Sequence, residues 1–155
     1  MRSYALSCFA AALFVVFATG GDPASAEELV AYKVVDGEQI PDSLTGNAGD
    51  PVKGRAVAIN RKLGNCLACH EMPIPEQPFH GEVGPDLAGV ADRYSEGELR
   101  LRVVDPKKLN PESFMPAFYR NTGFHRVMKK FQGKSILSAE QVEDVVAYLM
   151  TLKAE

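Results

Sequence analysis

The sequence lacks a long apolar segment, a strong charge of either sign and any tryptophan. Its longest apolar run, residues 4–18, is too short to span a bilayer comfortably and does not predict a transmembrane helix. The formal net charge of −3 at pH 7 is only mildly acidic, which argues against nucleic acid as a partner. The chain has no internal repeat or low-complexity tract, and its 155 residues suit one domain.

Cysteine is also scarce, with three residues in two separate parts of the chain. Residues 1–26 have the features of a secretory signal: a positive charge precedes the apolar run, and an A-x-A cleavage site ends at Ala26. Cys8 lies within this signal and should leave with it. We therefore expect a periplasmic mature chain that has no membrane anchor and keeps only Cys66 and Cys69.

The two remaining cysteines belong to the stretch NCLACH at residues 65–70, which contains the C-x-x-C-H motif. This motif is the attachment signature of a c-type haem. Thiols at this spacing, Cys66 and Cys69, can add to both vinyl groups of the porphyrin, and His70 can bind the iron from the proximal side. No disulfide could then form within the mature chain. In a chain without tryptophan, the haem would make up much of the core.

Two other interpretations of the cysteine pair compete with haem attachment. A redox dithiol usually opens a helix in a β-α-β setting, and no such pattern of strands surrounds Cys66. A zinc site needs further ligands at short spacing, but the other two histidines, His80 and His125, lie far apart. Covalent haem therefore fits the sequence better than a dithiol or a zinc site.

The proximal histidine needs an acceptor for its second ring N–H, because such a bond fixes the ring and raises its basicity. The backbone carbonyl of Pro85, in the sequence Gly84-Pro85, is the candidate acceptor for His70. The alternative is that Gly84 and Pro85 form only a turn.

The distal side of the iron can take a second protein ligand. The candidates are Met72, Met115, Met128, His80 and His125. Met72 is too close to His70 in sequence to cross to the other haem face. Met115 lies between two prolines in an irregular stretch, which can lay a thioether across the distal face, and such a ligand raises the reduction potential. We favour Met115 and keep Met128, His125 and an open position as alternatives.

Helix signals occur on both sides of the motif. Residues 51–63 follow an Asp-Pro start, and Val52 belongs to their apolar stripe. Gly54 and Ala58 lie four residues apart and would permit close approach of another helix. Residues 138–152 carry a capping box and an apolar stripe, and we expect this helix to cross the first one at the small residues.

Two further helices are expected. Residues 95–104 begin with a capping box. Phe124, Met128 and Phe131 recur at helical spacing and predict a short helix. Basic residues flank this third pattern. Such a run usually forms only a solvated face, but it could also dock an acidic partner.

The predicted domain organisation is a signal peptide at 1–26, an N-terminal extension at 27–49 and a haem domain at 50–155. Within the extension, residues 29–35 could form a short strand. An Asp-Gly turn follows this segment. The extension could pack on the domain, contact a partner or stay loose.

The order of the motifs resembles the class I cytochromes c over about residues 50–152. The shared motifs are the C-x-x-C-H box, GPDL at 84–87, Met115-Pro116 and VVAYL at 145–149. The resemblance implies an all-α fold with helices packed around one covalent haem c. It also implies axial ligation by His70 and Met115, and a bond from His70 to the carbonyl of Pro85.

Within that family, the chain is similar to SoxX, the monohaem subunits of the SoxAX cytochromes of sulfur-oxidising bacteria. The similarity rests on residues 40–46, the NCLACH box and FMPAF at 114–118. It implies a heterodimer with a SoxA-like haem subunit. That complex would form a heterodisulfide between thiosulfate, or related inorganic sulfur, and a cysteine of the SoxYZ carrier, and would pass two electrons to a downstream cytochrome c.

In such a complex the reactive cysteine belongs to SoxA. The resemblance therefore implies that this chain is the electron-accepting, non-catalytic subunit of an L-cysteine S-thiosulfotransferase. Two other functions remain open: a free periplasmic cytochrome c that shuttles electrons, and a haem sensor with an open iron position.

Overall fold

The computed structural model describes residues 28–154. The predicted signal peptide at 1–26, with its cleavage site after Ala26, lies outside the described residues. Among the helices of the described part, none is both long and apolar enough to cross a membrane.

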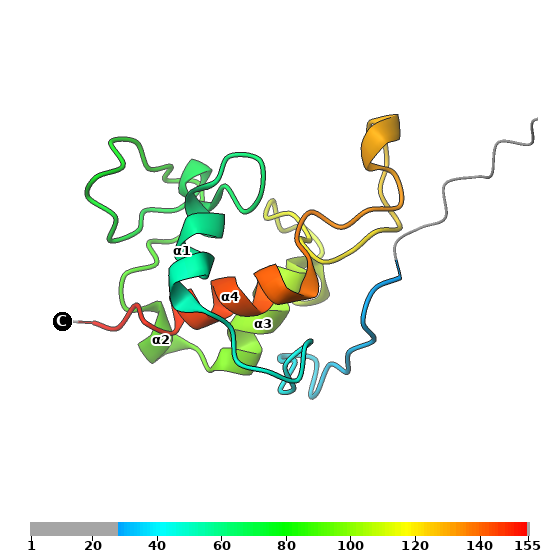
Figure 1. The fold of residues 1–155 in the computed structure, drawn as a ribbon, viewed down its shortest axis with the longest axis horizontal. Helices are drawn as coiled ribbons and strands as arrows, with labels where there is room; N and C mark the ends of the chain where they lie inside the picture. The colour runs from blue at the N-terminus through cyan, green and yellow to red at the C-terminus, as the bar shows by residue number, and fades with distance from the viewer. Residues whose placement is uncertain (1–27, 155) are drawn as a thin grey trace, which may run out of the picture.

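The described chain is built from short helices and irregular loops (Figure 1). The elements are α1 (Pro51–Ile59), η1 (Cys66–Ala68), α2 (Val90–Arg93), α3 (Glu96–Val104), η2 (Pro106–Lys108), η3 (Lys129–Phe131) and α4 (Ala139–Leu149). Within residues 28–154, β pairing is limited to one isolated bridge between Val35 and Gln39. The all-α class that the sequence predicts is confirmed.

Helices α1 and α4 cross closely at small residues, as the sequence predicts. A Cβ atom placed on Gly54 would overlap the backbone carbonyl of Asp144 in α4, so only glycine allows this approach. Ala58, one turn further along α1, is fully buried. The predicted inner stripe through Val52 is wrong, because that side chain is 77% exposed and α1 buries the face of Gly54 instead.

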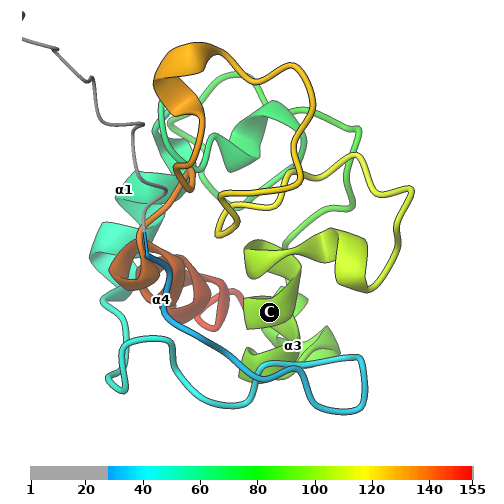
Figure 2. The ribbon, with the colours of Figure 1, turned by 90° about the vertical axis from the view of Figure 1, so that its right-hand side faces the viewer.

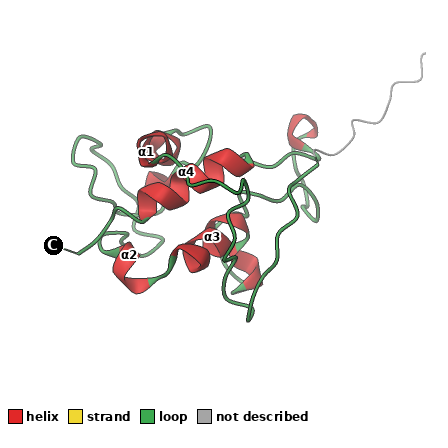
Figure 3. Cartoon of the chain, turned by 60° about the horizontal axis from the view of Figure 1, so that its bottom comes forward, coloured by secondary structure: helices red, strands yellow, loops and turns green. Residues whose placement is uncertain are grey.

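Helix α4 lies between α1 and α3 (Figure 3). Both predicted capping boxes are present: Ser95 accepts from the Glu98 N–H at the start of α3, and Ser138 accepts from the Gln141 N–H at the start of α4. The apolar residues that face each other between the helices form one core, which includes Leu99, Val103, Val142, Val145 and Val146.

The N-terminal extension packs against α3 and α4 (Figure 2). Packing on the domain is the first of the three alternatives that the sequence leaves open. Arg100 of α3 is buried and forms two-pronged hydrogen bonds with the carboxylate of Glu143 of α4, at 2.9 to 3.1 Å. Its remaining nitrogen donates to the carbonyl of Ile40 at 2.8 Å. Glu143 also accepts from the Leu44 N–H at 2.9 Å. This pair of opposite charges therefore holds the extension at two points.

Three expectations about local structure are wrong. Residues 29–35 form no strand, although the turn that follows them is present, with Gly37 in the left-handed region at φ 75°. Residues 124–131 form only the turn η3, because their apolar side chains find no core to pack against. Helix α1 ends at Ile59 instead of continuing toward Gly64, since Asn60 adopts an extended conformation.

Two smaller differences concern the remaining helices. Helix α4 ends at Leu149, three residues earlier than predicted, although Leu152 is still buried in the core. Helix α2 is a single turn that begins after Gly89 at φ 64°, and no sequence pattern predicted it.

The crossing of α1 and α4 gives a first prediction. Gly54→Ala should lower the free energy of unfolding by about 1–3 kcal/mol, because the added methyl group overlaps the α4 backbone. On an exposed helix the same change raises stability by roughly 1 kcal/mol, so the sign of the effect reports the contact. Denaturant unfolding followed by circular dichroism measures it. The control Val52→Ala, on the exposed face of α1, should change stability by less than about 0.5 kcal/mol.

Candidate functional site

The C-x-x-C-H stretch forms one tight turn a few residues after α1. The turn opens at Asn65, whose φ of 49° places it in the left-handed region. The carbonyl of Cys66 then accepts from the N–H groups of Cys69 and His70, at 3.1 and 3.0 Å. Leu67, between the cysteines, is buried in the core and fixes the turn to the domain. The structure therefore brings the two predicted thiols and the predicted proximal histidine together within one turn.

The two cysteines lie in different surroundings. Cys66 is half-buried against the core, whereas Cys69 is exposed. Burial raises the pKa of the Cys66 thiol to about 11, because the charged thiolate is poorly solvated there.

The imidazole of His70 is held through one of its two nitrogens. Its Nδ1 atom lies 2.7 Å from the carbonyl oxygen of Pro85. A carbonyl only accepts hydrogen bonds, so Nδ1 carries the proton and the lone pair is on Nε2. A Cβ atom on Gly84 would overlap the ring, which shows that the backbone at Gly84 lies directly against it. The ring is thus oriented with Nε2 available as a ligand.

The loop of residues 71–84 folds back onto the C-x-x-C-H turn, a feature that the sequence analysis missed. Gly81 donates to the carbonyl of Leu67 at 2.8 Å, and Gly84 donates to the carbonyl of Cys69 at 2.7 Å. A Cβ on Gly81 would overlap the carbonyl of Ala68. Two glycines in an otherwise proline-rich loop were the sequence signal for this close approach.

The structure separates the candidates for a distal ligand. Met72 is only 3% exposed and packs in the core, and its N–H donates to Nδ1 of His80 at 3.2 Å. Met128 is 61% exposed on the loop near η3. His125 is also exposed.

Met115 is half-buried at the edge of the core, in the irregular stretch between η2 and η3. Two hydrogen bonds to the end of α3 hold that stretch: Phe118 donates to the carbonyl of Val103 and Tyr119 to that of Val104, both at 3.2 Å. Of the three methionine candidates, Met115 alone is neither enclosed in the core nor largely exposed to solvent.

The donor set fits a covalently attached haem better than a metal ion held by side chains. The described residues contain no group of three or more His, Cys, Asp or Glu side chains that could hold a metal ion. They do provide two free thiols, an oriented imidazole and a half-buried thioether. The same loops expose large apolar side chains: Phe79, Val83 and Phe114 are 82%, 75% and 95% exposed.

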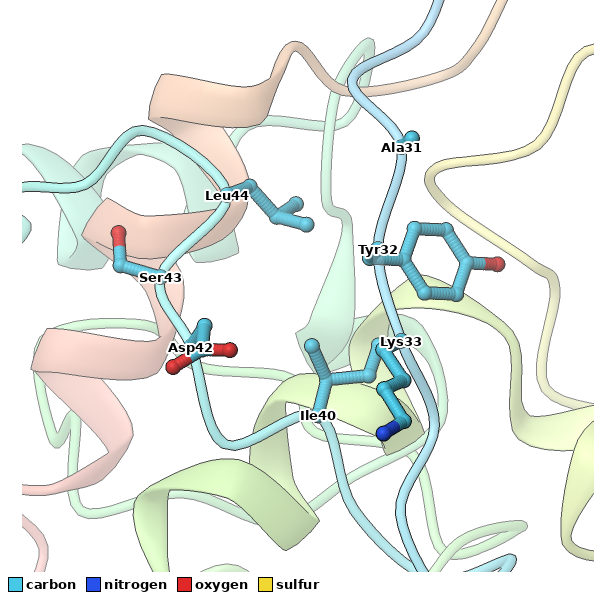
Figure 4. Close-up of a pocket in the computed structure, with 7 residues that line it drawn as sticks. All are labelled: Ala31, Tyr32, Lys33, Ile40, Asp42, Ser43 and Leu44. Carbon is cyan, nitrogen blue, oxygen red and sulfur yellow. The ribbon is translucent and has the colours of Figure 1, made fainter.

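A pocket of the described residues lies elsewhere, in the N-terminal extension (Figure 4). It has a volume of about 400 Å³ and is bounded by residues 31–33 and 40–44 of the extension. Ile40 and Leu44 contribute apolar side chains to it, and none of the predicted site residues lines it. The pocket is therefore separate from the C-x-x-C-H turn.

Comparison with known proteins agrees with this geometry. The family model described as Cytochrome c matches residues 51–153. No curated protein sequence matches the chain. Among solved structures, a chain in the crystal structure of SoxXA from P. pantotrophus is 41% identical, with a TM-score of 0.71.

That alignment covers 80% of this chain and 94% of the SoxXA chain. Proteins of the matched family carry covalently bound haem c, which is the group that the thiols and the imidazole fit. The chain belongs to the cytochrome c family, as a class I member of the SoxX kind.

Proposed function

We propose that this chain is the electron-accepting subunit of a SoxAX-type complex and holds one haem c through thioethers at Cys66 and Cys69. The observation that carries the proposal is the single turn that joins both thiols to His70, with the imidazole bonded to the Pro85 carbonyl. A haem bound there supplies one-electron chemistry at iron. The protein's part is to position the ligands.

The proximal side depends on the orientation of His70. The Pro85 carbonyl accepts from Nδ1 and so leaves the Nε2 lone pair available, and the Gly84 backbone lies against the ring. His70 would then hold the iron through Nε2. We propose Met115 as the distal ligand, because its stretch is tied to α3 and its thioether is only half-buried.

The proposed reaction of the complex joins a carrier thiol to thiosulfate. The thiol of a SoxYZ cysteine loses its proton, its sulfur bonds to the terminal sulfur of thiosulfate, and two electrons leave. We propose that a SoxA-like haem subunit carries the reactive cysteine, because both cysteines that remain after signal cleavage would be thioethers here. The chain described here then accepts the electrons one at a time and passes them to a downstream cytochrome c.

We also propose how the chain assembles and where it is located. The related crystal structure is that of SoxXA, a complex, and this likeness supports a heterodimer with a SoxA-like partner. We propose export to the periplasm with cleavage after Ala26, because the A-x-A sequence follows a short apolar run. We further propose 27–49 as an extension that belongs to the folded unit and 50–155 as the haem domain.

Covalent attachment can be tested directly. Mass spectrometry of the denatured mature protein should give the polypeptide mass plus one haem, and acidic organic solvent should extract no pigment. Cys66→Ala/Cys69→Ala should carry no covalent haem. Release of free haem from the wild-type chain would contradict attachment through Cys66 and Cys69.

The distal ligand has its own test. Met115→Leu should abolish the weak far-red sulfur-to-iron band of the ferric protein and lower the reduction potential, because leucine offers no thioether. Met128→Leu is the matched control, since Met128 is largely exposed, and it should leave both properties nearly unchanged. Loss of the band in Met128→Leu alone would show that the wrong methionine had been chosen.

The role of the subunit is tested by reconstitution. In the presence of SoxYZ and thiosulfate, the isolated chain should remain oxidised, because it offers no free thiol for the reaction. Addition of a SoxA-like subunit should lead to reduction of this chain, measured by its absorbance. A chain that migrates alone in native extract would favour a free electron shuttle, and carbon monoxide binding to the ferrous chain would favour a sensor with an open position.

A further inference from the structure

The positive charge of this acidic chain is concentrated in one segment. Between Glu112 and Glu140 the sequence contains no aspartate or glutamate. The same stretch contains five cations: Arg120, Arg126, Lys129, Lys130 and Lys134. A formal charge of +5 over residues 113–139 contrasts with −3 for the whole chain, so the field of this segment has the opposite sign to the rest of the protein.

The segment is an excursion whose two ends meet at one residue. The carbonyl of Phe118 accepts from the N–H groups of Ile136 and Leu137, at 3.0 and 2.9 Å. Residues 119–135, here called the basic excursion, therefore form a loop that closes at Phe118. At its start Tyr119 is buried in the core and Arg120 pairs with Asp105 at 3.2 Å, so the excursion projects from the domain only after these residues. Figures 1 and 2 show the turn η3, in orange, standing at the top of the molecule, away from α3 and α4. Compact loops with this closure often carry function.

The basic excursion begins just beyond Met115, the proposed distal ligand. Phe118 is buried and its N–H is bonded to Val103 of α3, so the base of the excursion is fixed to the core beside the site. The base of the excursion therefore adjoins the loop that carries Met115.

The excursion also exposes apolar side chains. Phe124, Met128 and Phe131 are 38%, 61% and 52% exposed, although their spacing would suit a buried helical stripe. Lys130 lies over the ring of Phe131, with its nitrogen 4.7 Å from the ring centroid. Among the described ion pairs, none involves Lys129, Lys130 or Lys134. The surface thus combines cations that lack a carboxylate partner with aromatic and thioether groups.

We propose that the basic excursion is a docking surface for a redox protein that presents an acidic patch around an apolar centre. The inference rests on the proposed electron-transfer function and identifies the kind of partner that receives the electrons. Charge complementarity favours this occupant, because opposite charges accelerate encounter and orient it. A permanent subunit interface is depleted in lysine at its centre, so the excursion suits a transient partner better than the stable one.

The test uses the full mature chain, loaded with haem and bound to its SoxA-like subunit. Plant plastocyanin, a copper protein with an acidic patch, serves as the electron acceptor probe in stopped-flow measurements on the reduced complex. The rate constant should fall as salt increases. Lys129→Glu/Lys130→Glu should lower it by roughly tenfold at low ionic strength and remove most of its salt dependence.

Two further variants separate an effect of the excursion from an effect of net charge. Lys33→Glu/Lys53→Glu changes the net charge by the same amount as Lys129→Glu/Lys130→Glu, but at exposed positions of the extension and of α1. It should alter the rate constant by less than about twofold. Lys129→Gln/Lys130→Gln should give an intermediate rate, which separates charge from misfolding. Circular dichroism and the far-red band should be unchanged in all variants.

Several outcomes would overturn the inference. Equal effects of the excursion and control variants would show that only net charge matters. Loss of the SoxA-like subunit during purification of Lys129→Glu/Lys130→Glu would make the excursion part of the stable interface. Loss of binding to phosphatidylglycerol vesicles, with an unchanged rate toward plastocyanin, would assign it to a lipid surface. Failure of the wild-type complex to hold haem or pass electrons would instead refute the proposed function.

Discussion

The close crossing of α1 and α4 is the constraint on which the rest of the structure depends. It requires Gly54, because any side chain there would meet the backbone of α4. Helix α1 ends a few residues before Cys66, so the helix that is locked against α4 also positions the attachment turn. The buried pair Arg100–Glu143 then joins α4 to α3 and to the extension. Removing one member would leave an unpaired buried charge and cost about 3–5 kcal/mol.

The site itself depends on backbone contacts more than on side chains. Glycines allow the loop of residues 71–84 to lie against the C-x-x-C-H turn, and the carbonyl of Pro85 fixes the tautomer of His70. These neutral, rigid contacts suit electron transfer, in which ligands should move little between the two oxidation states. In the proposed reaction, the formation of the sulfur–sulfur bond takes place at thiols of partner proteins.

Sequence reasoning succeeded where the signal is local. The capping boxes at Ser95 and Ser138 work through bonds between residues three apart, and they mark the starts of α3 and α4. It failed at residues 124–131, where helical spacing of Phe124, Met128 and Phe131 predicted a helix. An apolar stripe stabilises a helix only if a neighbouring surface covers it, and the basic excursion has no such surface within the described chain.

The sequence by itself determined the haem signature, the family, the all-α class and the crossing of the first and last helices, because each depends on residue types at fixed spacing. Only the tertiary structure decided that α1 buries the face of Gly54, that the extension is held by Arg100 and Glu143, and that Met72 lies in the core while Met115 does not. Those features depend on contacts between residues far apart in the chain, whose pairing no local pattern records.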